Sequence, residues 1–259
     1  MPQHDPTGLD GDLSLTGRIT TASNATFLGE ISGVPVVYKP IAGERPLWDF
    51  PDGDLASREV AAYLVSADLG WDIVPPTWLR DGPLGPGMVQ VWRDIDPDHP
   101  AVDLVPAEDV PASGWRTVLE GDDENDDPVA LIHEDTPALR RMAVFDVVVN
   151  NADRKGAHVL AMAGGHRHGV DHGLTFHAEH KLRTVLWGWI GDELTSDEIE
   201  GLTRLRGHLS PDHDLGAALA SLITTAELEA FGERCRALVE AACFPAPSGS
   251  SSAVPWPLF

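Results

Sequence analysis

The sequence has few cysteines and few basic residues, and both shortages exclude classes of protein. Cys235 and Cys243 are the only cysteines among 259 residues, and no CxxC motif occurs. One such pair does not make a disulfide framework, so a reducing cytoplasm is the simpler setting. Lys and Arg number 18 against 41 Asp and Glu, which gives a formal net charge of −23. This excess repels nucleic acid and anionic lipid, so we expect neither a nucleic-acid partner nor stable membrane association.

Long apolar runs and a targeting segment are also missing. No stretch approaches the roughly 18 apolar residues that a membrane-spanning helix needs. The opening segment, MPQHDPTGLDGDLSL, has neither a basic region nor an apolar core, so it does not resemble a signal peptide. We therefore expect a cytoplasmic protein. Hydrophobic residues make up 42% of the chain, which is enough for the core of one bilobal domain or of two small ones.

The first half of the chain contains signals for a hairpin and a helix. Residues 29–40 predict a hairpin that turns at Ser32-Gly33, with Pro35 indicating an edge strand or a strand beginning. Residues 55–69 have helical periodicity between a plausible N-cap, Asp54, and a plausible stop, Gly70. The expected buried stripe of this helix consists of Ala56, Val60, Tyr63, Leu64 and Ala67.

The remaining elements follow in an α+β order. Two further strands are expected at 74–79 and 87–92, and residues 94–128 are acidic, Pro-rich and hard to assign. Thr136 and Pro137 suit the N-cap and first residue of a helix that runs to about Asn150. Later we expect short strands at 159–162 and 168–170 around Gly164-Gly165, helices at 197–209 and 215–242, and a Pro/Ser-rich tail without a core at 244–259. This pattern indicates a small β-rich part followed by a larger helical part.

A lysine on a strand and a glutamate on a helix form the first candidate functional pair. Lys39 lies in the strand sequence VVYKP, and Glu59 follows twenty residues later in the expected helix. Taken alone, each is ordinarily a solvated surface side chain. Together they match the arrangement in which a strand lysine holds nucleotide phosphates and a helix glutamate holds that lysine in place. We therefore predict an ion pair between Lys39 and Glu59 at a nucleotide site.

The segment NNADRKGAHVL, residues 150–160, gives a more specific signal. It is a loop between an apolar helix and a strand, and Asp153, Lys155 and His158 have the spacing Asp-x-Lys-x-x-(metal ligand) of a phosphoryl-transfer loop. In such loops the aspartate orients or deprotonates the attacking hydroxyl, and the lysine neutralises the transferred phosphoryl group. The residue five positions after the aspartate helps to hold Mg²⁺. The simpler alternative is a charged turn at a helix end.

Asp171 completes the set of candidates. It follows a short apolar strand, eighteen residues after Asp153, in the sequence HGVDHG. This context resembles the metal-binding aspartate at the start of an activation segment, and Mg²⁺ prefers carboxylate and phosphate oxygens. An aspartate in a turn before glycine is the alternative. Four signals in the right order predict an α+β, bilobal, protein-kinase-like fold, with the N-lobe at 13–96, the C-lobe at 97–243 and a hinge near 91–96.

At these residues the sequence resembles an actinobacterial family of phosphatidylinositol 3-/4-kinase-like proteins, distantly related to the HipA-type kinases. The resemblance covers 13–243, and these stretches carry it: VVYKPIAGERPLWDFP, LASREVAAYLVSADLGWDIVPPT, RRMAVFDVVVNNADRKGAHVL, GVDHGLTFH and KLRTVLWGW. It implies that Lys39 and Glu59 form the ion pair, that Asp153 is catalytic, and that His158 and Asp171 occupy metal positions. It also implies ATP and a divalent ion as cofactors.

The sequence departs from the family pattern at two places. His158 stands where an asparagine is expected, and histidine is a softer ligand that favours Mn²⁺ or Zn²⁺ more than asparagine does. No glycine-rich loop precedes Lys39, and the corresponding turn is TASNATFLGE, residues 21–30. Ser23 and Asn24 could contact the phosphates there. We expect ATP with Mg²⁺ or Mn²⁺.

Other conspicuous residues have simpler interpretations. Histidine is dense in the segment 158–180, and His166-x-His168 on a strand would point both rings the same way, but a dedicated zinc site without a nearby carboxylate pattern is a weak prediction. Core packing is the favoured role for four aromatic residues, Trp48, Phe50, Trp187 and Trp189, although the first two could wall the nucleotide site. Arg45 and Arg58 could reach phosphates, but a surface position is the simpler expectation.

Three functions remain open on the sequence alone. The first is an ATP-dependent phosphotransferase acting on a protein, on itself or on a small molecule. The second is a catalytically silent nucleotide-binding pseudokinase or scaffold, which the unusual His158 and the missing glycine loop favour. The third is a metal-dependent hydrolase using the histidines, for which an HExxH framework is lacking. A membrane-lipid acceptor is disfavoured because the chain lacks a basic face and a basic amphipathic helix.

Overall fold

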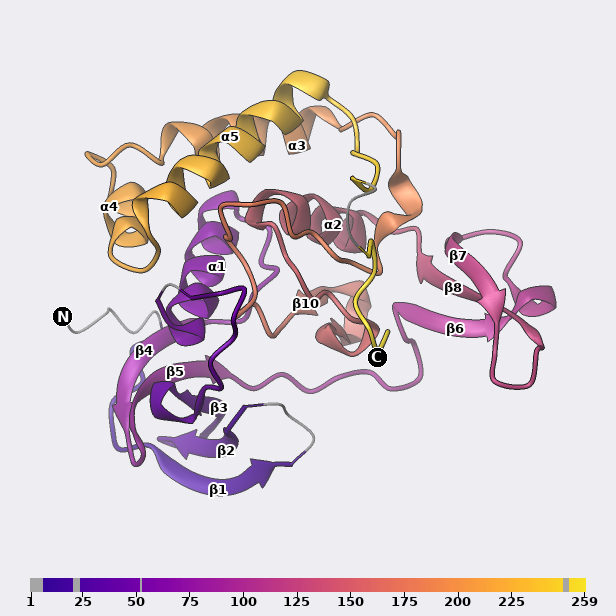
Figure 1. Ribbon diagram of the computed structural model, residues 1–259. Coiled ribbons are helices and arrows are strands. Elements are labelled where there is room, and N and C mark those ends of the chain that lie inside the picture. The colour runs from indigo at the N-terminus through magenta and orange to yellow at the C-terminus, as the bar shows by residue number, and fades with distance from the viewer. Residues whose placement is uncertain (1–6, 21–23, 52, 249–251) are drawn as a thin grey trace.

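The computed structural model describes residues 7–20, 24–51, 53–248 and 252–259. It is an α+β structure with a β-rich N-terminal sheet and a largely helical C-terminal part (Figure 1). The N-terminal sheet is antiparallel, with strand order β1-β2-β3-β5-β4. Its strands are β1 (Ser14–Ile19), β2 (Thr26–Ile31), β3 (Val34–Pro40), β4 (Thr77–Gly82) and β5 (Gly85–Val91). The strand expected at 74–79 therefore begins and ends three residues later.

The β2–β3 hairpin forms as predicted, but β3 is not an edge strand. Ser32 and Gly33 have φ of 50° and 81°, the left-handed pair that suits a two-residue hairpin turn. β3 lies between β2 and β5, so the edge expectation from Pro35 is wrong and the strand-beginning alternative is right. Pro35 lies one residue beyond the last β3–β5 pair, Val36 with Val91, so its missing N–H falls at the end of the ladder and not within it. Its carbonyl accepts from the Trp92 N–H at 3.0 Å.

The first helix, α1 (Leu55–Leu69), has the predicted bounds and caps. The Asp54 carboxylate accepts from the Ser57 N–H at 2.6 Å, and Gly70 ends the helix at φ 69°. The predicted stripe is only partly right, because Ala67 is exposed whereas Arg58 and Glu59 are buried. α1 packs against the sheet on one side and against the C-terminal helices on another, so more than one face is covered (Figure 1).

The C-terminal part is built around α2 (Pro137–Val149), which begins at the predicted Thr136 cap and ends at Asn150, φ 56°. Helix α5 (Thr225–Ala241) packs against α2, whereas α3 (Ser196–Gly207) and α4 (Asp214–Ala220) pack against α1 and α5 (Figure 1). The single helix expected at 215–242 is wrong. Thr224 and Glu227 form a capping box that starts α5 as a separate helix.

The acidic segment that resisted assignment, 94–128, forms a second antiparallel sheet together with the residues that follow it. Its strands are β6 (Val102–Pro106), β7 (Trp115–Asp122) and β8 (Pro128–Glu134), in the order β6-β8-β7. The Asp123 carboxylate accepts from the N–H groups of Asn125 and Asp127, which closes the β7–β8 turn. A short ribbon of β9 (Val159–Ala161) and β10 (Arg167–Gly169) follows α2 and turns at Gly164-Gly165 as predicted.

The tail was expected to have no core of its own, and the structure docks it on the main core of the molecule. Phe244 is buried with the helical core, and Leu258 packs against that core. The Ala253 carbonyl accepts from the Trp187 indole N–H at 2.7 Å, and the Leu258 carbonyl accepts from the Gly156 N–H at 2.8 Å. The chain end therefore returns to the middle of the molecule (Figure 1). Within the described residues, none of the helices is long and apolar enough to cross a membrane.

We expect a chain shortened to end at residue 248 to be less stable by about 2–4 kcal/mol. The lost contacts are three hydrogen bonds, each worth about 0.5–1.5 kcal/mol, and partly buried apolar surface of Leu258. Urea unfolding measures the difference. Trp256→Ala is the matched control, because this side chain is 84% exposed and its removal should change the free energy of unfolding by less than about 0.5 kcal/mol. A shortened chain as stable as the full one would contradict the docking of the tail.

Candidate functional site

Three elements bring one lysine between two carboxylates. Lys39 is near the end of β3, Glu59 is in the first half of α1, and Asp171 follows β10. The Lys39 ammonium is 2.6 Å from Glu59 Oε1 and 2.7 Å from Asp171 Oδ1. The predicted Lys39–Glu59 ion pair is therefore present, and Asp171 joins it from 132 residues away in the sequence.

Glu59 holds the backbone next to Asp171 as well as the lysine. Its side chain is buried, and its second oxygen, Oε2, accepts from the His172 N–H at 2.9 Å. Asp171 has a left-handed backbone, with φ of 60°, a conformation that Asp and Asn adopt more readily than most residues. The one glutamate thus fixes both Lys39 and the turn that presents the Asp171 carboxylate.

The charges in this cluster stabilise one another. Burial alone would lower the pKa of Lys39, but the carboxylates of Asp171 and Glu59 raise it well above its ordinary value. The Lys39 charge holds the pKa of Asp171 far below the ordinary range. Half of the Asp171 side chain, 51%, is exposed, so water screens part of this attraction. At neutral pH the Lys39 ammonium and the Asp171 carboxylate are therefore both charged.

The loop after α2 presents Asp153 beside this cluster. The Asn151 side-chain oxygen accepts from the Asp153 N–H at 3.0 Å, which orients the loop. Burial raises the pKa of the Asp153 carboxyl, although the charge of Lys155 opposes the shift. Lys155 Nζ is 3.4 Å from Asp153 Oδ2. A partly buried carboxylate with a raised pKa is a suitable acceptor for a proton.

His158 and Asp171 face each other in a way that suits a cation. His158 Nδ1 is 2.9 Å from the Asp153 carbonyl, so the ring proton belongs on Nδ1. The other nitrogen, Nε2, then has a free lone pair, and it lies 3.4 Å from Asp171 Oδ2. Burial lowers the pKa of His158, which favours this neutral form. Two electron-pair donors that face each other fit a divalent ion, and a histidine whose other nitrogen donates to a carbonyl is a common metal ligand.

Two residues, Ser23 and Asn24, were the candidates for phosphate contacts. No contact among the described residues places Asn24 at this cluster. The Asn24 side-chain oxygen accepts from the Arg45 N–H at 2.9 Å and so braces the loop after β3. Ser23 lies outside the described residues. Lys39, Glu59, Asp153, Lys155, His158 and Asp171 are linked to one another by the contacts above.

Comparison with known proteins assigns the chain to a family. No family model matches the sequence. Protein Rv2133c of Mycobacterium tuberculosis is 48% identical over 263 aligned positions, which cover 96% of this chain and 93% of that protein. The chain belongs to the Rv2133c family. The Helicobacter pylori proinflammatory kinase CtkA superposes over 90% of this chain and 92% of its own, with a TM-score of 0.43 and 12% identity. That TM-score is below the level at which two folds can be equated.

This member of the Rv2133c family has a buried ion pair that the sequence did not reveal. Arg154 of the loop and Asp146 of α2 are both 0% exposed and lie 2.9 Å apart. Arg154 also donates to the carbonyls of His158 and Val170, at 3.1 Å each. The guanidinium therefore holds the backbone on both sides of the His158–Asp171 pair. An aspartate within the apolar helix sequence MAVFDVVV was the available signal, because a buried charge requires a partner.

Two other sequence expectations are wrong at this point. Arg58 is neither on the surface nor placed among the cluster, because it is 2% exposed and pairs with Glu227 of α5 at 2.6 Å. Its guanidinium also donates to the Thr175 carbonyl. Trp48 was expected in the core but is 90% exposed, whereas Phe50, Trp187 and Trp189 are buried as expected. The Arg58–Glu227 pair instead joins α1 to the C-terminal helices.

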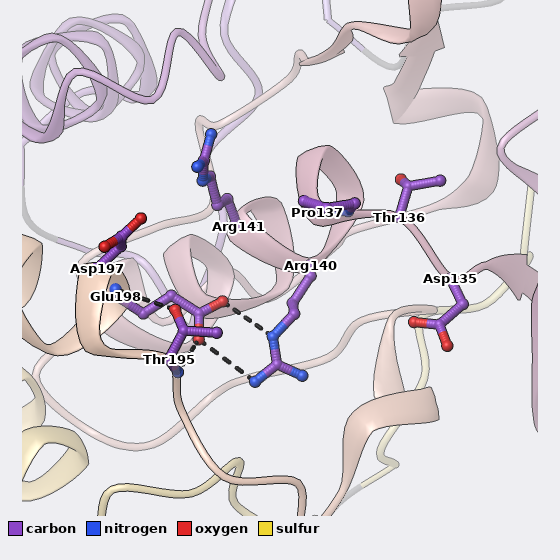
Figure 2. A pocket seen from close by; sticks show the side chains of 8 residues that line it. All are labelled: Asp135, Thr136, Pro137, Arg140, Arg141, Thr195, Asp197 and Glu198. Atoms are coloured by element: carbon purple, nitrogen blue, oxygen red, sulfur yellow. Dashed lines mark hydrogen bonds and ion pairs between the residues drawn. The ribbon is translucent and has the colours of Figure 1, made fainter.

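A pocket of about 380 Å³ lies elsewhere in the fold, between the N-termini of α2 and α3 (Figure 2). It shares no residue with the Lys39 cluster. Its prominent cation, Arg140, is already bound by Glu198, with Nε 2.9 Å from Oε1, as the dashed lines in Figure 2 show. Asp135 and Asp197 add further negative charge to its lining. Because its prominent cation is already paired, this pocket is accounted for by the ion pair between the two capped helix ends. The Lys39 cluster is therefore the stronger candidate for a functional site.

Proposed function

We propose that the protein is an ATP- and divalent-metal-dependent phosphotransferase with a kinase-like bilobal fold, of the phosphatidylinositol 3-/4-kinase-like type. One observation supports this above all. Lys39 is held between the helix glutamate Glu59 and the turn aspartate Asp171, with a second aspartate, Asp153, on the adjacent loop. A strand lysine with these two carboxylate partners is the arrangement that phosphoryl-transfer enzymes of this kind use to orient a triphosphate.

Each residue of the cluster has a role in this proposal. Lys39 binds phosphate oxygens, and Glu59 positions the lysine. Asp171 and His158 would hold Mg²⁺ or Mn²⁺, which when bound neutralises developing charge on the phosphates. Asp153 accepts the proton of the acceptor hydroxyl, and Lys155 neutralises the phosphoryl group in transfer. The donor set is compatible with either ion, because a carboxylate suits Mg²⁺ and an imidazole suits Mn²⁺ better.

The nucleotide base has a candidate place after β5. Residues 92–101 leave the N-terminal sheet and lead to the second sheet, and the Asp96 N–H donates to the Ala161 carbonyl of β9 at 2.7 Å. We propose that this connection, at 91–96, is the hinge between lobes 13–96 and 97–243 and that its backbone binds adenine. Ser23 and Asn24, which precede β2 in the sequence, are the proposed phosphate contacts in place of a glycine-rich loop.

The proposed acceptor is a protein, the chain itself or a small molecule. The net charge of −23 disfavours an anionic membrane surface as the place of reaction. A catalytically silent nucleotide-binding protein is the second candidate. The observation that favours it is His158, which takes a position where an asparagine amide is expected and whose lowered pKa reflects its burial.

Calorimetric titration of ATP, with Mg²⁺ and with Mn²⁺, tests the proposal. We expect metal-dependent binding by the parent and roughly 10- to 100-fold weaker binding by Lys39→Met, since a charged hydrogen bond contributes about 1.5–3 kcal/mol. Arg236→Met is the matched control, because this exposed cation of α5 pairs with Glu233 and Glu240 of the same helix. Mass spectrometry for phosphate on the chain then separates an enzyme from a silent binder. Equal affinities for parent and Lys39→Met would contradict the proposed site.

A further inference from the structure

A second group of metal-ligand side chains lies apart from the Lys39 cluster. His166 precedes β10, His168 is within it, and Asp72 lies on the connection between α1 and β4. One donor atom from each of the three residues lies within 4.8 Å of the other two. The sequence alone indicated only the two histidines, because the carboxylate comes from a segment 94 residues away.

The distances in this group suit a four-coordinate ion. His166 Nε2 is 3.4 Å from His168 Nδ1 and 3.5 Å from Asp72 Oδ2. Ligands at about 2.0–2.1 Å from a tetrahedral ion lie about 3.4 Å from one another. The remaining pair, His168 and Asp72, can close by rotation of the Asp72 side chain, which is 70% exposed. The three donors therefore need little rearrangement to share one ion.

The surroundings also favour a cation at this place. Without an ion, His166 Nε2 donates to the Asp72 carbonyl at 2.9 Å and His168 Nδ1 donates to the Ile73 carbonyl at 3.2 Å. The Ile73 carbonyl also accepts from the Gly169 N–H, so it keeps a partner when the imidazole proton leaves. The buried ring of His168 can therefore offer Nδ1 to an ion without leaving an unpaired carbonyl behind.

We propose that Asp72, His166 and His168 form a zinc site. Two imidazole nitrogens and one carboxylate oxygen are a common protein ligand set for this ion, and a water molecule completes the tetrahedron. His166 and Asp72 are accessible to an entering ion, with 37% and 70% of their side chains exposed. Only His168 is buried.

The ion would join two segments that lead into the Lys39 cluster. Asp72 follows α1, which contains Glu59, and His168 is three residues before Asp171. Glu59 and Asp171 are the two carboxylates that hold Lys39. A zinc ion at this place would therefore fix the far end of α1 to β10 and stabilise the spacing of those carboxylates. Zinc binding at this site requires neither ATP nor a phosphate acceptor, so it can be tested independently of the proposed phosphotransferase function.

Calorimetric titration of metal-stripped protein with zinc chloride tests the site. The variants are Asp72→Asn, His166→Ala and His168→Ala, with His99→Ala as the matched histidine control, since His99 is exposed and pairs with Asp96. Asp171→Asn is titrated in parallel because Asp171 and His158 could bind zinc themselves. We expect one zinc ion per chain for the parent, for His99→Ala and for Asp171→Asn, with a zinc-induced rise in melting temperature.

Asp72→Asn and His166→Ala alter exposed side chains, so they should remain folded. Each should weaken zinc binding by at least about 10-fold, the smallest loss usual even for residues that only support a ligand. Because His168 is buried, the result for His168→Ala is interpreted only if the circular dichroism spectrum of this variant matches that of the parent. The proposal is overturned if the parent binds no zinc, or if Asp72→Asn and His166→Ala bind it like the parent. It is also overturned if Asp171→Asn alone abolishes binding, because the ion then belongs to the other cluster.

Discussion

Asp171→Asn is expected to abolish metal-dependent ATP binding, whereas Asp153→Asn is expected to preserve binding and lower turnover by roughly 10² or more. The difference arises from what each carboxylate faces. Asp171 contacts the Lys39 ammonium and the free lone pair of His158, which is the proposed ion position. Without its charge, a triphosphate would meet Asp153 with no bound ion to offset the repulsion.

Asp153 differs because its neighbours support proton transfer and not ion binding. Burial raises the pKa of its carboxyl, and Lys155 Nζ lies 3.4 Å from Asp153 Oδ2. An amide in its place keeps the shape of the loop but cannot accept a proton. The loss therefore falls on the chemical step, which a general base accelerates by about 10²–10⁴. Binding, which depends on Lys39 and Asp171, should change little.

Both Asp171→Asn and Asp153→Asn are expected to fold, so differences in ATP binding and turnover can be attributed to the lost carboxylates. Asn suits the left-handed backbone of Asp171, φ 60°, and neither side chain is fully buried, with 51% and 26% exposed. Asp212→Asn, at an exposed position, makes the same chemical change outside the cluster. Calorimetry measures ATP binding, and labelled-phosphate transfer measures turnover. Two variants that bind ATP and turn over like the parent would place the site elsewhere.

The local signals in the sequence predicted the elements that begin and end at capping residues. Asp54, Thr136 and Gly70 each specify a helix boundary through contacts within four residues, and the Ser32-Gly33 turn specifies its hairpin in the same way. The strands within 94–128 were missed because alternation there is weak and the Asp123 turn is acidic. Strands β6 and β7 both depend on pairing with β8. A turn separates β7 from β8, and β6 is farther from β8 in the sequence.

The candidate site was predictable as a set of residue types but not as a network. The order of Lys39, Glu59, Asp153 and Asp171 indicated a shared site, and the structure brings Lys39 and Asp171 together across 132 residues. The long-range partners had no local signal. The Arg58–Glu227 pair and the hydrogen bond between Trp187 and Ala253 join segments that are far apart in the sequence. No pattern in either segment indicates its partner. Such contacts form by tertiary packing, after the helices and strands have come together in space, and so they leave no local sequence signal.

The buried pair of Asp146 and Arg154 should produce the largest loss of stability from a single substitution. Both side chains are 0% exposed, and the Asp146 carboxylate accepts from Arg154 Nε and Nη2 and from the Asn151 amide. In Asp146→Ala the guanidinium would remain buried without its counter-charge. Removing one partner of such a pair costs about 3–5 kcal/mol of unfolding free energy. Urea or thermal unfolding measures it.

Two further variants separate the lost pair from the lost volume. Arg236→Ala removes an exposed arginine that pairs with the exposed carboxylates of Glu233 and Glu240, and it should change the free energy of unfolding little because water screens these pairs. Asp146→Leu combined with Arg154→Met replaces both charges with apolar groups and should recover much of the stability lost in Asp146→Ala.

The recovered stability should not restore the proposed site. Arg154 also donates to the carbonyls of His158 and Val170, and a methionine cannot hold these backbone groups on either side of the His158–Asp171 pair. The double variant should therefore be folded and yet bind ATP and metal more weakly than the parent. If Asp146→Ala costs less than about 1 kcal/mol, the pair is not the scaffold of the loop. If the double variant binds ATP as the parent does, Arg154 supports stability alone.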